Sequence, residues 1–351
     1  MTEKIKLAQG AGGELMDSFI KKKILKYFKE ESKKAEIPLS MLDDSAVIDD
    51  IVFSTDSHTV SPLVFPGGDL GSLAVAGTVN DIAVMGAKPI ALSAGFIVEE
   101  GIDSDLFEKI VKSMSKTAKK ADVPIVTGDT KVVERGAIQE FMINTSGIGK
   151  RTDLLDKNIE IVKKYRDFNS RWLIDSNLKE GDKIILSGNI GEHGIALMSF
   201  REGYGFETEI KSDIAPVNKL LEKALKKGGL VAAKDPTRGG LANTLNEFSE
   251  KSRIGIIVDE DKIPIPRGVK SACDMLGIDP LQIGNEGKIV IGVVKEKAEQ
   301  ILETIKNHPL GKNAEIIGQA TKKVDGVVLE TTIGGKRNLH KPLGDPVPRI
   351  C

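Results

Sequence analysis

The sequence predicts an α/β or α+β fold, in which strands and helices are interleaved along the chain and divided between two domains. The chain has 351 residues, which is enough for two domains and a substantial core. Short β-type runs alternate with helical patterns in both halves. A new strand pattern begins at Asp182, after a polar stretch that contains the only tryptophan, Trp172.

The first half carries three helical patterns separated by short strands. Residues 14–30 place apolar side chains near helical spacing, and residues 71–86 are small, apolar and end at Gly86. Asp103 is suited to cap the helix that follows it. The expected strands cover residues 45–48, 51–55, 90–98, 124–127 and 141–149.

Residues 150–180 are polar and basic, and we place the domain junction here. The predicted division is an N-terminal domain over 1–152, a C-terminal α/β domain over 153–334 and a flexible tail over 335–351. The basic run favours a solvated face over a partner surface. In the second half we expect a strand from Asp182, helices at 195–200, 216–226 and after Gly240, and further elements at 288–294, 296–306 and 326–332.

Composition narrows the class of protein. Net charge is −1 and aromatic content is 4%, which favours neither nucleic acid nor a membrane surface as a partner. No apolar run has transmembrane length, and the first residues do not resemble a signal peptide. The two cysteines, Cys273 and Cys351, indicate no disulfide scaffold, so a cytoplasmic location is expected.

Five aspartates stand beside turns and strand ends, each next to Ser, Thr, Gly or Asn. They are Asp43, Asp44, Asp56, Asp81 and Asp129. Carboxylates that are brought together repel one another unless a cation joins them, and Mg²⁺ is usually shared with phosphates. The alternative is a set of independent turn and cap residues. Asp81 favours a magnesium–nucleotide site, because it lies in an otherwise apolar helix where a charge needs a partner.

Glycine clusters precede helices at residues 10–13, 66–68 and 239–240, and each could hold a phosphate or form an ordinary turn. None has the spacing of a P-loop or of a dinucleotide-binding Rossmann motif. Lys131 directly follows Gly128-Asp129-Thr130, and could lie beside metal-bound phosphates. Glu286 lies in a glycine-flanked turn that we expect to present its side chain to solvent. A surface role remains the alternative for both.

The chain ends in Pro346-Val347-Pro348-Arg349-Ile350-Cys351. Two prolines keep this segment extended and prevent a helix. Ten to twelve extended residues reach roughly 35–40 Å. The terminal thiol could therefore be a substrate handle that enters an active site, or simply the last residue of a frayed end.

Taken together, these motifs resemble the hydrogenase maturation factor HypE family, the carbamoyl dehydratases. That family belongs to the superfamily of aminoimidazole ribonucleotide synthetase (PurM), selenophosphate synthetase and thiamine-monophosphate kinase. The matching segments are 10–16, 43–47, 55–56, 66–69, 77–87, 127–133, 235–240, 285–288 and the terminal Pro348-Arg349-Ile350-Cys351. The aspartate segments are typical of the whole superfamily, whereas the terminal segment is specific to HypE. Residues 151–175 depart from the family by their greater length, and His58 stands where an apolar or aromatic residue is expected, so we assign it no role.

The resemblance implies a two-domain PurM-like subunit in a homodimer, with ATP and Mg²⁺ as cofactors. It implies that Asp43, Asp44, Asp56, Asp81 and Asp129 hold the metal and, with Thr130 and Asp235, the nucleotide. Lys131 and Glu286 match residues that act on the modified cysteine.

The implied reaction is the ATP-dependent dehydration of a carbamoyl group on Cys351 to a thiocyanate. The carbamoyl group would come from the carbamoyltransferase HypF, and the cyanide would pass to the iron of the HypC–HypD complex for [NiFe]-hydrogenase. Two alternatives remain. One is another ATP-dependent enzyme of the superfamily, for which the absence of Cys from the glycine-rich start weakens selenophosphate synthetase. The other is an ATP-sensing scaffold with no activity.

Overall fold

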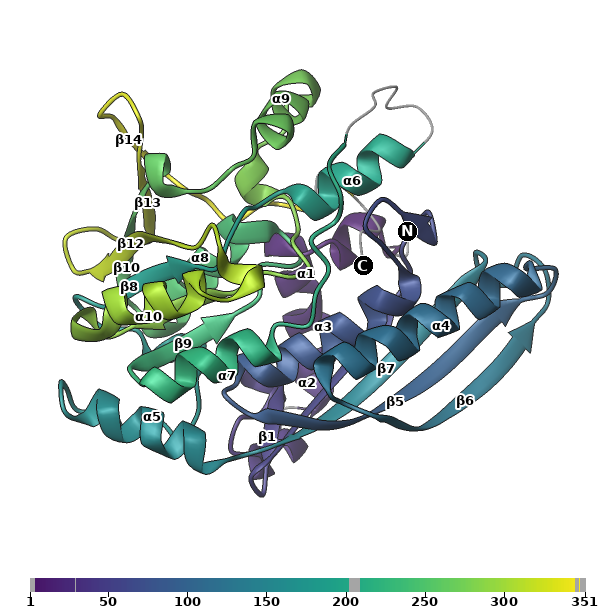
Figure 1. Ribbon diagram of the computed structural model, residues 1–351, viewed down its shortest axis with the longest axis horizontal. Helices are drawn as coiled ribbons and strands as arrows, with labels where there is room; N and C mark the ends of the chain where they lie inside the picture. The colour runs from purple at the N-terminus through teal and green to yellow at the C-terminus, as the bar shows by residue number, and fades with distance from the viewer. Residues whose placement is uncertain (1–3, 29, 202–208, 345–346, 348–351) are drawn as a thin grey trace.

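Two β-sheets form the frame of the molecule, one from each half of the chain (Figure 1). The computed structural model describes residues 4–28, 30–201, 209–344 and 347. The first sheet has the order β1-β2-β7-β5-β6, made of β1 (Ala46–Ile48), β2 (Ile51–His58), β7 (Phe141–Lys150), β5 (Lys88–Glu99) and β6 (Ile125–Val133). A small hairpin of β3 (Val64–Phe65) and β4 (Gly68–Asp69) precedes its first helix.

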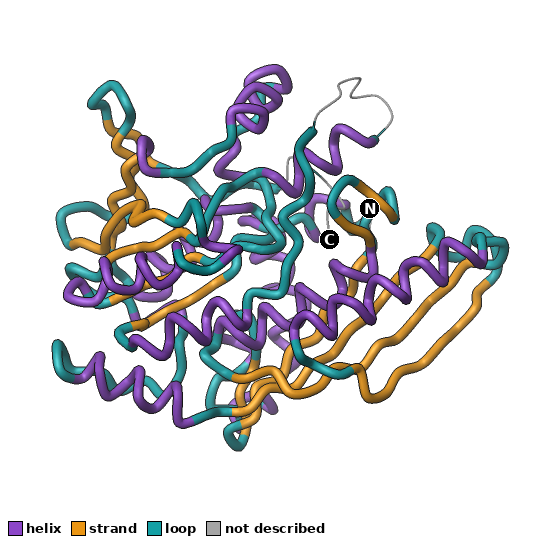
Figure 2. Tube along the Cα trace, in the orientation of Figure 1, coloured by secondary structure: helices purple, strands orange, loops and turns teal. Residues whose placement is uncertain are grey.

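Two helices cover one face of the first sheet, as Figure 2 shows in purple over orange. They are α3 (Leu70–Val84), which is buried along almost its whole length, and α4 (Ser104–Ala121), which buries one side only. Asp69 caps α3 by accepting from the Ser72 backbone N–H at 2.8 Å. The two helices pack closely at Gly71, where an added Cβ would lie 2.1 Å from a backbone oxygen of α4.

The second sheet has the order β14-β13-β10-β12-β8-β11-β9. Its strands are β8 (Lys183–Leu186), β9 (Leu230–Lys234), β10 (Gly255–Asp259), β11 (Val290–Val293), β12 (Glu315–Thr321), β13 (Val327–Glu330) and β14 (Lys336–Asn338). The helices of this half are α5 (Asp153–Lys163), α6 (Glu192–Phe200), α7 (Asn218–Lys227), α8 (Gly240–Ser252), α9 (Arg267–Leu276) and α10 (Ala298–Lys306). Strands β9 and β11 are buried at every residue, which explains their continuous apolar runs.

The N-terminal helical stretch lies across the C-terminal half of the molecule. It consists of α1 (Gly13–Phe19), a π-helical segment (Ile20–Leu25) and α2 (Lys26–Phe28). The helical spacing over residues 14–30 is therefore confirmed, although the middle of the stretch is wound more loosely than an α-helix.

The junction at 150–180 is more ordered than its composition suggests. Helix α5 buries Leu155, Ile159 and Val162, and Trp172 is completely buried. The lysines of α5, Lys157 and Lys163, are exposed. The lysines thus lie on the outer side of a helix whose inner side joins the core, whereas Arg151 and Arg166 of the same basic run are largely buried in ion pairs with Asp156 and Asp182.

The structure corrects several element boundaries. The strand expected at 124–127 continues to Val133 as β6. The sequence patterns also did not predict β10, β12 or α9. Residues 336–338 form β14, Leu339 is buried, and the Lys341 side chain is 6% exposed, so the segment after residue 335 begins as part of the folded body. Cys351 and Arg349 of the expected tail lie outside the described residues. No helix among the described residues is long and apolar enough to cross a membrane.

Candidate functional site

A pocket of about 260 Å³ lies where the two halves of the chain meet. Eight carboxyl groups line it: Asp17, Asp43, Asp44, Asp56, Asp81, Asp235, Glu247 and Glu286. Asn80 of α3 joins the halves, because its side chain accepts from the Val217 N–H at 2.8 Å and donates to the Glu286 carbonyl oxygen at 3.2 Å. This contact places neighbouring Asp81 beside the second half of the chain.

Three of these groups form what we call the acidic centre: Asp44, Asp81 and Asp235. One carboxylate oxygen from each lies within 4.8 Å of the others. Ser54 Oγ donates to Asp81 Oδ2 at 2.7 Å, but Asp235 Oδ2 is buried without a hydrogen-bond partner among the described residues. Burial and then the neighbouring carboxylates hold the pKa values of Asp81 and Asp235 well above the ordinary range. Oxygen ligands at this spacing fit a hard divalent cation such as Mg²⁺, which would remove the repulsion.

Two lysines that the sequence patterns did not identify stand beside the acidic centre. Lys234 Nζ lies 2.5 Å from Asp44, 3.3 Å from Asp175 and 3.1 Å from Glu247. Lys251 Nζ lies 2.6 Å from Asp175. Lys234 directly precedes Asp235 in the sequence, and that adjacency is the only signal that could have identified it.

The two lysines and burial act in opposite directions on the pKa values of the neighbouring carboxyl groups. Burial, reinforced by Asp175, raises the pKa of Asp43 to about 7, although Lys251 opposes the rise from 3.7 Å. Burial raises the pKa of Asp44 to about 6 despite its ion pair with Lys234. Burial acts on Asp175 in the same way, but the two lysines outweigh it and lower the pKa of that carboxyl. Asp175 is thus a fixed counter-charge, whereas burial favours the neutral forms of Asp43 and Asp44.

Glu286 lies inside the pocket, which corrects the expectation of an exposed turn. The residue is 2% exposed, because Asp213 accepts from its backbone N–H at 3.1 Å and holds the turn inward. Its Oε1 atom is buried with no partner in the described part of the chain. Burial, followed by repulsion from Asp235 and Asp213, holds the pKa of Glu286 well above its ordinary value. A carboxyl in this state readily accepts a proton.

Asp56 lines the same pocket on β2 and belongs to a hydrogen-bond chain. Its Oδ2 accepts from Thr78 Oγ1 at 3.0 Å, and Thr78 Oγ1 lies 2.6 Å from Thr145 Oγ1. Thr145 Oγ1 lies 3.4 Å from His58 Nε2. His58, to which the sequence assigned no role, is therefore a buried wall of the pocket, and burial lowers its pKa.

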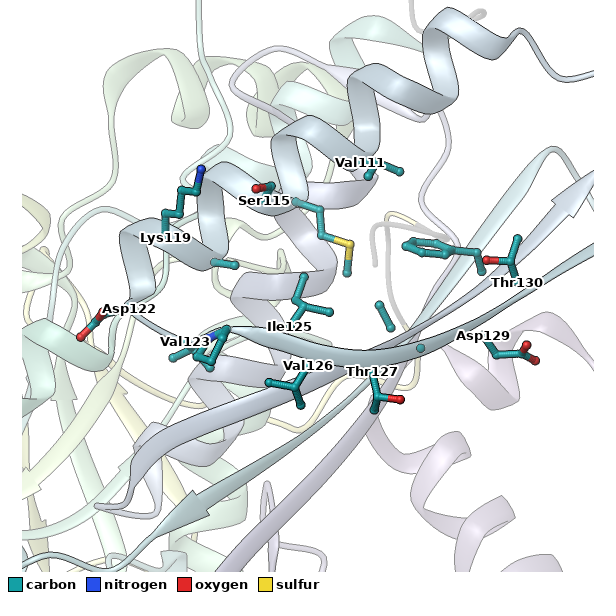
Figure 3. Close-up of a pocket in the computed structure, with 16 residues that line it drawn as sticks. Val111, Ser115, Lys119, Asp122, Val123, Ile125, Val126, Thr127, Asp129 and Thr130 are labelled. Atoms are coloured by element: carbon teal, nitrogen blue, oxygen red, sulfur yellow. The ribbon is translucent and has the colours of Figure 1, made fainter.

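Asp129, Thr130 and Lys131 do not join the other predicted site residues within one chain. They lie on β6, the edge strand, whereas Asp56 lies three strand spacings away on β2, or about 14 Å. Asp129 pairs with Gly95 of β5, Gly95 pairs with Asn144 of β7, and Asn144 pairs with Ser57 of β2. Residues that pair across a sheet point to the same side of it, so Asp129 faces the same side as Ser57 and the opposite side from Asp56. Asp129 and Thr130 line a groove of about 1080 Å³ between β6 and α4, shown in Figure 3.

The two cysteines differ sharply in what the structure says of them. Cys273 is 1% exposed, and burial raises the pKa of its thiol to about 12. A thiol in that state is a poor nucleophile. The predicted substrate carrier, Cys351, lies outside the described residues.

Comparisons with known proteins match both halves of the chain. Residues 42–150 match the AIR synthase related protein, N-terminal domain, and residues 179–330 match the AIR synthase related protein, C-terminal domain. A protein of Methanocaldococcus jannaschii assigned to hydrogenase expression and formation is 53% identical over 99% of this chain and 100% of its own length. The carbamoyl dehydratase HypE of Bradyrhizobium diazoefficiens is 42% identical over 99% of this chain and 96% of its own length.

Two solved structures are similar to the fold as well as to the sequence. HypE in a HypE–HypF complex is 43% identical, with a TM-score of 0.83 over 93% of this chain and 100% of that one. HypE in complex with ATP is 39% identical, with a TM-score of 0.78 over 99% of this chain and 100% of that one. The identity extends over nearly the whole length of the chain and over both domains of the fold. The chain therefore belongs to the HypE family of AIR synthase related proteins.

Proposed function

We propose that this protein uses ATP to dehydrate a carbamoyl group on its own Cys351, giving a thiocyanate that supplies a cyanide ligand for the iron of [NiFe]-hydrogenase. The acidic centre is the observation that carries the proposal, because its buried, mutually repelling carboxylates suit a metal–nucleotide site. The name carbamoyl dehydratase for relatives at 42% identity and the ATP complex of a similar structure support it.

Asp44, Asp81 and Asp235 would hold Mg²⁺, with Asp43 and Asp56 next to them in the pocket wall. The metal would neutralise charge on the phosphates of ATP. Arg238 lines the same pocket and offers the nucleotide a guanidinium, the group that best pairs with phosphate oxygens.

The carbamoyl group needs activation because its oxygen is a poor leaving group. Its oxygen attacks the γ-phosphorus of ATP, the bond from that phosphorus to ADP breaks, and one N–H proton is lost. The product is an imidate phosphate, S–C(=NH)–O–phosphate. Loss of the second N–H proton and breakage of the C–O bond then give S–C≡N and inorganic phosphate. The sulfur keeps its bond to carbon throughout, and no oxidant or reductant is needed.

Glu286 is the residue proposed to accept one of the two nitrogen protons. Its position inside the pocket, an Oε1 that no described residue bonds, and its raised pKa make it a better proton acceptor than an ordinary surface carboxylate. Cys273 is a poorer acceptor for the carbamoyl group, because it is 1% exposed and burial raises the pKa of its thiol to about 12.

A homodimer belongs to the same proposal. The face of the first sheet opposite α3 leaves large apolar side chains exposed, among them Phe53, Ile97 and Ile148. Packing two such faces would bury them and would bring the polar residues of one edge strand, Asp129 and Lys131, to a second chain. Those two residues would then complete a site that a single chain leaves without them.

HypF and the HypC–HypD complex are the proposed partners. A similar protein has been crystallised with HypF, which supports HypF as the source of the carbamoyl group. The HypC–HypD complex as cyanide acceptor and the cytoplasmic location follow from the proposed chemistry, which needs ATP and a reduced thiol.

The test is to incubate the protein with HypF, carbamoyl phosphate and Mg-ATP, and to analyse the C-terminal peptide by mass spectrometry. The wild type should carry a cyano group on Cys351, and Cys351→Ala should carry none while remaining folded. Cys273→Ser is the matched control and should be modified like the wild type. A cyano group on any other residue would refute the proposal.

A further inference from the structure

The segment Leu339–Leu343, which we call the strap, is fixed to both helices that border the acidic pocket. On one side, the Leu339 carbonyl oxygen accepts from Asn246 Nδ2 of α8 at 2.9 Å. On the other, the carbonyl oxygens of Pro342 and Leu343 accept from the backbone N–H groups of Glu14 and Leu15 in α1, at 3.0 and 3.4 Å.

Lys341 strengthens the strap with charge. Its side chain is 6% exposed, and Nζ lies 2.6 Å from Asp17 of α1 and 3.5 Å from Glu250 of α8. Gly13 makes room for the strap: its φ is +73°, and a Cβ added there would lie 1.9 Å from the Pro342 carbonyl oxygen. The strap is therefore held at a fixed point on the rim of the pocket.

Val347 is a second fixed point, four residues before the end of the chain. It is fully buried in an apolar cluster with Ile195, Val269 and Ile283. A Cβ added at Gly194 of α6 would lie 3.6 Å from Val347 Cγ2 and 2.3 Å from Ile283 Cγ2, so the valine occupies the space between α6 and Ile283. Burial of an apolar side chain so close to a chain end requires an explanation beyond fraying.

The apolar cluster around Val347 is connected, through Ile283, to the part of the pocket that holds Glu286 and Asp235. Asn285 Nδ2 donates to the carbonyl oxygens of Ile283 at 2.9 Å and Pro236 at 3.1 Å, which joins the turn of Glu286 to the loop of Asp235. Glu286 is three residues from Ile283, at most about 10 Å along the chain, and Cys351 can extend at most about 14 Å beyond Val347. The reach of the terminal thiol is therefore of the same order as the separation between the Val347 cluster and Glu286.

We propose that Val347 is a positioning residue, an apolar plug that seats the C-terminal arm so that Cys351 reaches the acidic pocket in a fixed register. The strap sets where the arm begins, and the plug sets where its last four residues begin. This role rests on the proposed function, since it assigns the plug to the delivery of the carbamoylated cysteine. Its physical content, a seated arm, can be measured without any activity.

The first measurement is the alkylation rate of Cys351 by a maleimide in the full-length protein. A thiol held among carboxylates forms its thiolate less readily, so Cys351 should react about tenfold more slowly than in a synthetic peptide of the last six residues. Val347→Asp should restore a rate close to that of the peptide. Val347→Ile keeps the apolar plug and should react like the wild type, and Cys351→Ala should not be labelled.

Leu343→Asp is the matched control, because it places the same charge on the same arm at a side chain that is 68% exposed. It should alkylate like the wild type. The second measurement is the first-order rate of thiocyanate formation on carbamoylated protein at saturating Mg-ATP. This rate should fall about tenfold or more in Val347→Asp, as expected for loss of a buried valine, with ATP affinity unchanged and Leu343→Asp unaffected.

The inference fails if Cys351 of the wild type is alkylated as fast as the peptide, or if Cys351 of Val347→Asp is alkylated as slowly as that of the wild type. It fails also if Leu343→Asp changes the alkylation rate as much as Val347→Asp does. It also fails if alkylation accelerates while thiocyanate formation is unchanged, because seating would then not position the thiol. If the wild type forms no thiocyanate, the proposed function fails, and the alkylation rates alone still decide whether the arm is seated.

Discussion

The charge of Asp43 should destabilise the folded protein at alkaline pH when no cation is present. Asp43 is buried, with only 2% of its side chain exposed, and its Oδ2 has no hydrogen-bond partner among the described residues. Burial and Asp175 raise its pKa from 3.8 to about 7. Because folding raises the pKa of this acid, the destabilisation is absent below the unfolded pKa, grows as the pH rises and is complete above the folded pKa.

The size of the effect follows from the shift. At 1.36 kcal/mol per pKa unit, Asp43 costs the folded protein about 4 kcal/mol at pH 8, where it is buried as an ion, and about 1.6 kcal/mol at pH 5, where folding must protonate it. Asp43→Asn removes this cost at both pH values. Any hydrogen bond that the amide loses costs the same at both, so the difference between the two gains isolates the charge. The substitution should therefore stabilise the protein by about 2–3 kcal/mol more at pH 8 than at pH 5.

The assay is urea unfolding at pH 5 and pH 8 in the presence of a chelator. Asp325→Asn, on an exposed turn, is the matched control and should change the free energy of unfolding by less than about 0.5 kcal/mol at either pH. An equal effect of Asp43→Asn at the two pH values, or a larger gain at pH 5, would refute the reasoning that burial holds a charge there at a cost.

Three further substitutions test the pocket. Asp81→Asn should abolish the thermal stabilisation by Mg-ATP and lower ATP turnover by about two orders of magnitude or more, whereas unchanged turnover would exclude Asp81 from the site. Glu286→Gln should slow thiocyanate formation by about 10²–10⁴-fold with ATP affinity retained, and an equal loss of affinity would instead indicate a binding role. Lys234→Met should lower the free energy of unfolding by about 3–5 kcal/mol, since it leaves buried carboxylates unpaired, and calorimetry showing a neutral effect would contradict the proposed network.

Local features of the sequence predict much of the fold. Helices α3 and α4 were predicted because their signals are near in sequence: the small apolar run that ends at Gly86, where φ is +82°, for α3, and the cap Asp103 with an apolar face for α4. The short strands β10 and β12 were missed. Their stability comes from pairing with strands far along the chain, and a short apolar run alone does not reveal such pairing.

The candidate site was predictable in its residue types but less so in its geometry. Asp44 and Asp81 of the five predicted aspartates lie together, and Asp235, which only the family resemblance implied, lies beside them. No local pattern reveals that β6 is an edge strand, so Asp129 and Lys131 could not be placed. Glu286 is buried by Asp213 and Asn80, which are 73 and 206 positions away. Residues that hold a turn in place across such separations leave no local signal in one sequence.

The central claim is that ATP removes the carbamoyl oxygen as phosphate. The direct measurement is to carbamoylate Cys351 with a carbamoyl group labelled with a heavy oxygen isotope, add Mg-ATP, and determine the mass of the inorganic phosphate released. The reaction proposed here predicts that the labelled oxygen appears in inorganic phosphate, in proportion to the thiocyanate formed on Cys351. Thiocyanate formed with unlabelled phosphate would contradict it, because the oxygen would then have left without being phosphorylated.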